Sequence, residues 1–474
     1  MSSSKGDTIM ASNGSASKRK IIDVMVIHVE VRLKPLYDVI IADIRKTVAA
    51  LLRERLKSWG VEDINMIRPG EFDECEWHSD SLLEKYVEKI RISECEEREE
   101  KADPSIDPFD FIIYAYHTAS KDDIEELMAN EAEGAGDESA QDDTMAATVL
   151  ELPNASLDGS WETLYYENQM KEKLLRYIFT TLIYSDANID TNIISWNRLL
   201  LIHGPPGTGK TSLCRSLAHK LSIRLADRYT YGKLIEVNSH SLFSKWFSES
   251  GKLVQRMFSM IQEMASDPDA FIVVLIDEVE SLTASRASAS SGTEPSDAIR
   301  VVNALLTQLD KLKQRSNVLV VTTSNLSDNI DPAFIDRADI KQYIGPPKAP
   351  AIYHILRSCF MELVRVKLID IGTDELPSMY HHDAVHGKKG SIEKELATLC
   401  ESAVGMSGRT LRRLPILAHS KLYTTRTNVS PAKWVKAMRQ VLSSSQLESL
   451  EVKEGSTLHL KKPKGGTKGG VLSF

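Results

Sequence analysis

Residues 199–211 read Leu-Leu-Leu-Ile-His-Gly-Pro-Pro-Gly-Thr-Gly-Lys-Thr, an apolar run followed at once by a glycine-rich turn. The apolar part predicts a buried strand over Leu199–His203. The residues that follow, Ser212–Leu221, predict a helix. A strand that passes through a glycine-rich turn into a helix is typical of a βαβ unit, so this stretch predicts an α/β fold with a parallel sheet.

The turn satisfies the phosphate-binding pattern G-x-x-x-x-G-K-[ST] with Gly204, Pro205, Pro206, Gly207, Thr208, Gly209, Lys210 and Thr211. Glycines let the backbone N–H groups point at a phosphate, and the N-terminus of the next helix favours negative charge. We expect Lys210 to contact the β- and γ-phosphates of ATP and the Thr211 hydroxyl to hold Mg²⁺. A purely structural turn is the alternative, and the flanking strand and helix argue against it.

Two later strands end on polar residues that extend this site. Phe271–Ile276 is an apolar run that ends on Asp277 and Glu278. Adjacent side chains of a strand point to opposite faces, so we expect Asp277 to hold the Mg²⁺ hydration shell and Glu278 to orient and deprotonate the attacking water. The strand Val318–Thr322 leads to Asn325, a candidate sensor of the γ-phosphate and the water. The alternative for these polar side chains is a solvated turn.

Two arginines are candidates for contacts with the terminal phosphate. Arg337 lies between Asp336 and Asp339, where an exposed guanidinium could reach the γ-phosphate of a neighbouring subunit. A surface ion pair is the alternative for this residue. Arg409 begins a helix of the C-terminal part and could sense nucleotide within its own subunit, or could be an ordinary solvated arginine.

The pattern along the chain predicts a parallel-sheet domain between smaller parts. Its strands are Leu199–His203, Leu234–Asn238, Ile272–Ile276 and Val318–Thr322, and the helices Ala351–Val366, Ile392–Ala403, Leu411–Tyr423 and Pro431–Leu442 form a lid. The predicted segments are a disordered tail 1–20, an α+β module 21–120, an acidic linker 121–158, the large domain 159–345, the lid 346–450 and a flexible tail 451–474.

The N-terminal module is predicted from a strand pattern over Ile27–Leu33, a helical pattern over Leu36–Leu56 and a second strand over Phe109–Tyr116. After it, no Lys or Arg occurs between Asp122 and Met170, while acidic residues are frequent. Such a run repels itself and predicts a mobile spacer, with a docking site for a basic partner as the alternative.

Composition narrows the class of protein. Hydrophobic residues make up 42% and charged residues 26% of the 474 residues, and no apolar run approaches the length of a membrane span. The net charge of -9 argues against a broad nucleic-acid surface. The five cysteines have neither zinc spacing nor a disulfide pattern, which fits a reducing compartment. Residues 1–20 lack a secretory signal; Ser17–Lys20 is either a nuclear import patch or a solvated basic cluster.

Together these motifs resemble the AAA+ ATPases. Three longer stretches, 238–252, 294–300 and 336–345, resemble more particularly the pachytene-checkpoint AAA+ family, and the likeness is close over roughly 161–423. The resemblance implies a homo-hexameric ring that remodels HORMA-domain proteins, with or without a HORMA-family adaptor. It implies roles in meiotic recombination, chromosome synapsis and checkpoint signalling, and a location in the nucleus on meiotic chromosomes and also in the cytoplasm.

The resemblance also implies residue roles. It assigns Lys210 and Thr211 to ATP and Mg²⁺, Glu278 to hydrolysis, Asn325 and Arg409 to sensing, and Arg337 to a finger in trans. Lys245, Trp246 and Phe247 become the first substrate-gripping pore loop, with 286–296 near the second. The glycine and second arginine usual around an AAA+ finger are missing near Arg337, so its role depends on the closer family.

Two other classes of function remain open at this stage. A nucleic-acid motor or clamp loader shares the same ATPase core but predicts basic stripes, which the acidic balance does not offer. A non-hydrolysing scaffold gated by nucleotide is the second, and Glu278 argues against it. A GTP switch is disfavoured because no Asn-Lys-x-Asp segment occurs.

Overall fold

The computed structural model describes residues 20–36, 40–58, 70–71, 77, 80–102, 109–120, 124–128, 145–167, 169–237, 239, 250–281, 297–325, 330–370, 391–422 and 429–444. The chain divides into two compact units. The first comprises residues 1–119 with 223–228, and the second comprises 120–222 with 229–474.

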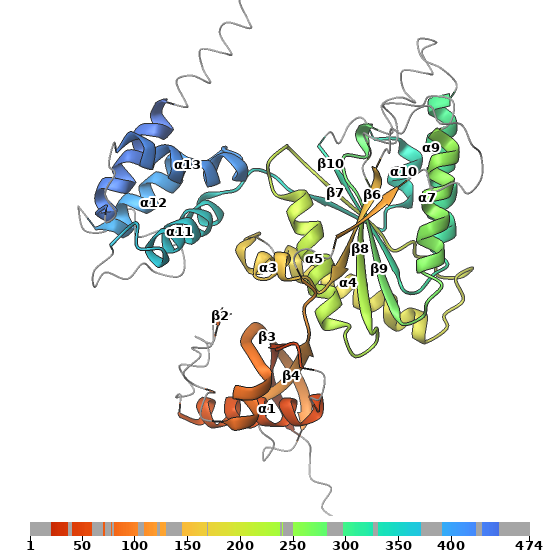
Figure 1. The fold of residues 1–474 in the computed structure, drawn as a ribbon, viewed down its shortest axis with the longest axis horizontal. Helices are drawn as coiled ribbons and strands as arrows, with labels where there is room; N and C mark the ends of the chain where they lie inside the picture. The colour runs from red at the N-terminus through yellow and green to blue at the C-terminus, as the bar shows by residue number, and fades with distance from the viewer. Residues whose placement is uncertain are drawn as a thin grey trace, which may run out of the picture. The chain divides into compact units, whose positions relative to one another are not determined.

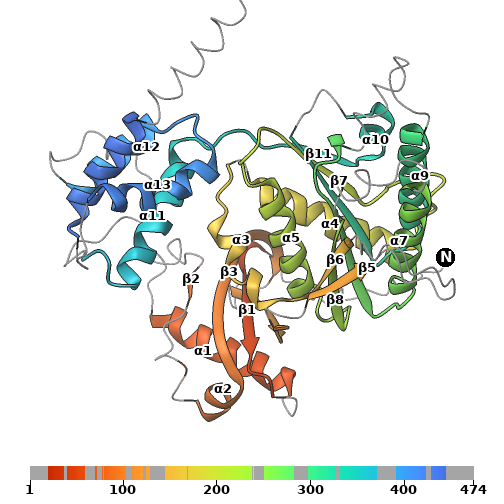
Figure 2. The same ribbon diagram turned by 45° about the horizontal axis from the view of Figure 1, so that its top comes forward.

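The first unit is an α+β module. A four-stranded sheet in the order β2-β3-β1-β4 pairs β1 antiparallel with β3 and parallel with β4. Helix α1 packs on this sheet because Ile44 and Val48 meet Ile27 and Val29 in one buried cluster, and Figure 2 shows α1 and α2 beside β1 and β3. The elements are β1 (Lys20–Leu33), α1 (Ile41–Ser58), β2 (Gly70–Glu71), α2 (Ser81–Tyr86), β3 (Val87–Ala102) and β4 (Phe109–Tyr116).

The second unit contains a seven-stranded sheet in the order β11-β7-β10-β9-β8-β6-β5. The five strands from β11 to β8 are parallel to their neighbours, while β6 and β5 are antiparallel. Every residue of β9 and β10 is buried, as expected for central strands covered on both faces. The strands are β5 (Ile124–Met128), β6 (Met145–Leu152), β7 (Leu199–His203), β8 (Tyr231–Val237), β9 (Ala270–Ile276), β10 (Val318–Ser324) and β11 (Ile340–Tyr343).

Helices cover both faces of this sheet. Helices α7 and α9 lie on one face and α5 on the other, which gives three layers (Figure 1). Phe258 of α7 and Leu305 of α9 share a core with Ile272 and Val274 of β9. The helices of this part are η3 (Ala155–Leu157), α3 (Ser160–Thr163), α4 (Met170–Asp186), α5 (Lys210–Arg224), α7 (Ser250–Met264), α9 (Asp297–Leu312) and α10 (Pro332–Arg337).

A helical lid follows the sheet, as predicted. Its helices are α11 (Ala349–Arg365), α12 (Ile392–Ser402), α13 (Gly408–Lys421) and a helix over 431–444. They share a separate core in which the rings of Phe360 and Trp434 are 5.3 Å apart. The predicted fold class, an AAA+ α/β domain with a helical lid and an α+β module before it, is confirmed.

The predicted acidic linker over 121–158 is wrong for two of its segments. Ile124–Met128 and Met145–Leu152 are the strands β5 and β6, which pair with each other and extend the sheet beyond β8. Val149 and Leu152 are buried in the core of the large domain, and β5 is the edge strand, where acidic side chains remain compatible with pairing. The rest of the acidic run, 129–144, lies outside the described residues.

Several predictions fall on residues that the structure does not describe. These are the tails 1–19 and 451–474, the pore-loop residues Lys245, Trp246 and Phe247, and the segment 286–296. Within the described part, no helix is long and apolar enough to cross a membrane.

Candidate active site

The glycine-rich turn connects β7 to α5 and is closed on one side by the lid. Gly207 has a φ of 75°, and a Cβ at this position would lie 2.9 Å from the Ser407 hydroxyl oxygen. The backbone N–H of Arg409 donates to the Gly207 carbonyl oxygen at 3.3 Å. Glycine is therefore required here by the left-handed backbone and by the close approach of the N-terminus of α13.

Lys210 and Thr211 form the first turn of α5 and face the site. The Lys210 ammonium is buried and donates to the carbonyl oxygens of Gly204 and Pro205, both at 2.9 Å. Burial lowers the pKa of Lys210, and the nearby carboxylates of Glu280, Asp277 and Glu278 oppose that shift.

The Asp277 carboxylate, just after β9, lies directly against the turn. It accepts hydrogen bonds from the Thr211 hydroxyl at 3.0 and 3.1 Å and from the Thr323 hydroxyl of β10. Asp277 and Thr211 therefore present oxygen atoms to the same space, which is the donor type that Mg²⁺ prefers. Among the described residues, no group of three or more acidic, histidine or cysteine side chains is arranged to hold a metal, so the protein alone does not form a closed metal cage here.

Glu278 and Asn325 also lie side by side. The Asn325 side-chain amide donates to one carboxylate oxygen of Glu278 at 3.1 Å, and the Asn325 backbone N–H donates to Glu280 at 3.0 Å. Glu278 has a positive φ of 56°, and its N–H donates to the Thr323 hydroxyl at 3.1 Å. Positive φ in a non-glycine residue costs about 1–3 kcal/mol and is concentrated at functional sites.

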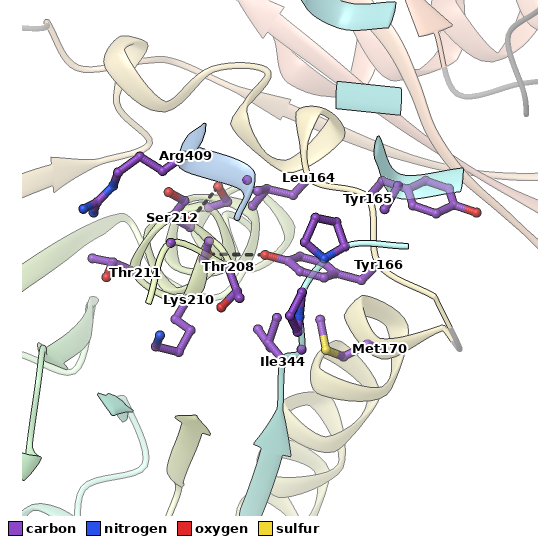
Figure 3. Close-up of a pocket in the computed structure, with 18 of the residues that line it drawn as sticks. Leu164, Tyr165, Tyr166, Met170, Thr208, Lys210, Thr211, Ser212, Ile344 and Arg409 are labelled. Carbon is purple, nitrogen blue, oxygen red and sulfur yellow. Dashed lines mark hydrogen bonds between the residues drawn. The ribbon is translucent and has the colours of Figure 1, made fainter. Parts of the chain in front are cut away.

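One cavity of about 1060 Å³ lies between the turn, the strand ends and the lid, and its lining includes Lys210, Thr211, Asp277, Glu278 and Asn325. Lys210, Thr211 and Arg409 are seen together at one end (Figure 3). The other end is formed by Leu164, Tyr165, Tyr166, Met170 and Ile344. The cavity thus has a polar end for phosphates and an apolar end suited to a flat ring.

The apolar end is built largely by residues 153–167, which we call the strap. The Tyr166 hydroxyl donates to the Gly209 carbonyl oxygen at 3.3 Å. Lys171 fixes the strap by donating to the carbonyl oxygens of Trp161 and Leu164 at 2.8 and 3.0 Å. The side of the strap facing α5 is held by the buried ammonium of Lys220, which pairs with Glu162 at 3.1 Å.

Three predicted site residues within the described part do not line the cavity, namely Gly204, Pro205 and Arg337. Gly204 and Pro205 begin the turn itself, whereas Arg337 lies elsewhere. Arg337 ends α10 and forms a bidentate ion pair with Asp310 of α9, with both N···O distances at 2.9 Å. Its third nitrogen donates to the Ala333 carbonyl oxygen at 2.8 Å. The guanidinium is held by residues of the same chain at the partly exposed end of α10.

Sequence reasoning missed three participants. Thr323 contacts both Asp277 and the Glu278 backbone, and its position two residues before Asn325 was a usable signal. Arg412 lines the cavity one helical turn after Arg409, and that spacing was a second usable signal. Tyr166 is 43 residues from its partner Gly209, and no local pattern connects the two.

The site fits a nucleoside triphosphate with a divalent cation. The turn exposes backbone N–H groups at a helix N-terminus, which suits an anion. The Thr211 hydroxyl and the Asp277 carboxylate provide oxygen donors at the same point.

Comparisons with known proteins agree with this geometry. Residues 200–346 match the model of the ATPase family associated with various cellular activities (AAA), 348–446 a TRIP13-like AAA+ ATPase lid C-terminal domain, and 22–121 a TRIP13 N-terminal domain. Pachytene checkpoint protein 2 homolog of Gallus gallus is 44% identical over 426 residues, covering 89% of this chain and 93% of the relative.

The Homo sapiens homolog is 51% identical over 65% of this chain and 72% of its own length. The solved structure of C. elegans PCH-2 has 31% identity and a TM-score of 0.66, covering 89% of this chain and 99% of that chain. The fold, the nucleotide site and these matches define an ATPase of the AAA class. More particularly, the chain belongs to the pachytene checkpoint protein 2 family.

Proposed function

We propose that this ATPase hydrolyses ATP in the described cavity, with Mg²⁺ held by Thr211 and through water by Asp277. The observation that carries the proposal is the continuous set of contacts from Thr211 through Asp277 to Thr323 and Glu278. Mg²⁺ supplies charge neutralisation at the phosphate oxygens. Lys210, which contacts turn carbonyls here, turns to the phosphates when a nucleotide binds.

Glu278 is the general base of this proposal, and Asn325 positions it. The amide of Asn325 holds one carboxylate oxygen of Glu278, which leaves the other oxygen to accept a proton from water. Arg409, beside the turn, senses the terminal phosphate, and Arg337 acts as a finger in a neighbouring subunit of a hexamer.

The output of hydrolysis is the remodelling of HORMA-domain proteins. Membership of the pachytene checkpoint protein 2 family supports this output, together with the resemblance of the segments 238–252 and 294–300 to that family. Lys245, Trp246 and Phe247 grip the client in this proposal. The proposed setting is meiotic recombination, chromosome synapsis and checkpoint signalling, with the protein in the nucleus on meiotic chromosomes and also in the cytoplasm.

Glu278→Gln tests both steps. We expect it to bind ATP with unchanged affinity, to lose hydrolysis by roughly a hundred-fold or more, and to lose conversion of a HORMA-domain protein between its closed and open forms. Phosphate release, nucleotide titration and the mobility of the HORMA conformers are the measurements. Glu263→Gln, an exposed carboxylate of α7, is the matched control.

Two outcomes separate the parts of the proposal. Substantial hydrolysis by the Glu278→Gln protein would remove Glu278 as the base. Hydrolysis by the unaltered protein without conversion of any HORMA-domain protein, alone or with a HORMA-family adaptor, would leave the ATPase intact and overturn the proposed client.

A further inference from the structure

Helix α13 presents two arginines to the nucleotide cavity. Arg409 and Arg412 are three positions apart, so they lie on the same face of the helix, and both line the cavity. Neither guanidinium has a hydrogen-bond or ion-pair partner within the described part of the chain. All three arginines Arg409, Arg412 and Arg413 are exposed, but Arg413 does not line the cavity.

The two arginines lie against different parts of the cavity. The backbone N–H of Arg409 contacts the Gly207 carbonyl oxygen at 3.3 Å, which puts this residue beside the middle of the glycine-rich turn. Arg412 lies one turn further along α13. Burial raises the pKa of the Tyr166 phenol, and the positive charge of Arg412 opposes that rise, which puts Arg412 near the strap end. The Tyr166 hydroxyl itself contacts Gly209.

Other positive charges gather on the same side. Burial lowers the pKa of His354 in α11, and the charges of Lys171, Arg357 and Arg412 lower it further. Like charges repel one another, so an anion between Arg412 and the strap stabilises this arrangement. The guanidinium group binds phosphate through two parallel N–H···O contacts and is weakly hydrated, which suits this role.

We propose that Arg412 is a second nucleotide-binding cation of the lid, and that it contacts the inner part of the nucleotide, the α-phosphate and ribose. Arg409 then contacts the terminal phosphate. The two arginines, on successive turns of α13, thus bind the two ends of the same triphosphate chain. The inference rests on the proposed nucleotide site. Because the inner part is common to substrate and product, Arg412 holds ATP and ADP alike, and it slows the release of ADP.

Nucleotide binding, measured without turnover, tests the assignment. Fluorescent ADP and a non-hydrolysable ATP analogue are titrated into the full chain and into the Arg412→Ala, Arg409→Ala and Arg413→Ala proteins. Removing a charge-assisted contact of this kind weakens binding by roughly ten-fold. We expect Arg412→Ala to weaken both ligands to a similar extent and to speed ADP release. We expect Arg409→Ala to weaken mainly the ATP analogue and Arg413→Ala to change neither.

Two further arms keep the outcomes distinct. Arg412→Lys keeps the charge but loses the planar fork, and we expect an intermediate affinity. Lys210→Ala tests the site as a whole. If Lys210→Ala binds nucleotide normally, the proposed site fails. If Lys210→Ala loses binding while Arg412→Ala matches the unaltered protein, the second cation alone is overturned. Loss of affinity for the ATP analogue only would overturn the inner position assigned to Arg412.

Discussion

Gly204 is the first residue after β7 and has a φ of 145°. The backbone of Ile344, just after β11, lies close to its Cα. A Cβ here would lie 2.0 Å from the Ile344 carbonyl oxygen, a distance that only a backbone shift can relieve. Gly204 is also joined to β10, since its N–H donates to the Ser324 carbonyl oxygen at 3.2 Å. The residue therefore couples the glycine-rich turn to two neighbouring strands.

This geometry predicts a large effect of Gly204→Ala. We expect the unfolding free energy to fall by more than about 4 kcal/mol, because both the left-handed backbone and the clash must be accommodated. Thermal unfolding and soluble yield measure it. Gly405→Ala is the control, because Gly405 has a φ of 94° but no atom within 4 Å of its added Cβ. It should cost about 1–2 kcal/mol, and equal losses in the two proteins would contradict the clash.

Residues of the site differ in how well sequence alone could place them. Asp277, Glu278 and Asn325 follow the ends of parallel strands, and the carboxyl ends of such strands meet at one edge, so their proximity follows from the fold. The proximity of Tyr166 to Gly209 depends on the path of the strap, which no periodicity encodes. For Arg337, an ion pair was the alternative prediction, and Asp336 and Asp339 were the neighbouring acidic residues. The structure shows an ion pair, but its partner is Asp310 of α9.

At the scale of elements, the strap joins the helix of the glycine-rich turn to the lid. On the α5 side, the Asn154 N–H donates to His219 at 3.2 Å and the Ser216 hydroxyl donates to Ser160 at 2.9 Å. On the lid side, the rings of Tyr165 and His354 stack with centroids 5.5 Å apart. The strap therefore contacts both the helix of the glycine-rich turn and the lid.

The stacked pair predicts a pH dependence. Burial first, and then three nearby cations, lower the pKa of His354 below its usual 6.5, so the folded chain favours the neutral ring. The unfolded chain binds a proton near pH 6.5, and stability contributed by the neutral ring is lost as the pH falls below that value. We expect the melting temperature to decrease as the pH is lowered from about 7 to about 5.

His354→Phe separates this contribution from others. The phenyl ring can still stack on Tyr165 but cannot take up a proton, so the variant should lose less stability than the unaltered chain over the same pH range. A residual slope remains, because burial and the charge of Lys210 also lower the pKa of His203. Identical pH profiles for the two proteins would exclude His354 as a contributor.

The strands β5 and β6 show where sequence reading of elements fails. Ile124–Met128 is five residues long, and two of them are glutamates within an acidic run. Charge composition therefore predicted a spacer, while the pairing that orders this segment comes from β6, some twenty residues later. The central strands β7, β9 and β10 were predicted well, because strands buried on both faces appear as continuous apolar runs.

At the scale of the whole molecule, the proposed hexamer requires Arg337 of one subunit to reach the nucleotide site of the next. The residue is rigidly held by Asp310 and Ala333, and it does not line the cavity of its own subunit. All three guanidinium nitrogens contact Asp310 or Ala333, which fixes the direction of the group at a partly exposed helix end. The finger in trans stays a proposal, in which Asp310 orients Arg337.

Mixing two inactive proteins tests this directly. Arg337→Ala keeps its base but lacks the finger, whereas Glu278→Gln keeps the finger but lacks its base. Each alone should lose hydrolysis, the finger variant by roughly 10³-fold or more. In mixed rings an Arg337→Ala subunit beside a Glu278→Gln neighbour has both groups at one site, so phosphate release should recover in proportion to such pairs. Mixing Lys210→Ala with Glu278→Gln, which lack groups of the same site, should give no recovery. If the first mixture also stays inactive while size-exclusion chromatography shows co-assembly, Arg337 acts within its own subunit, and its bond to Asp310 is structural.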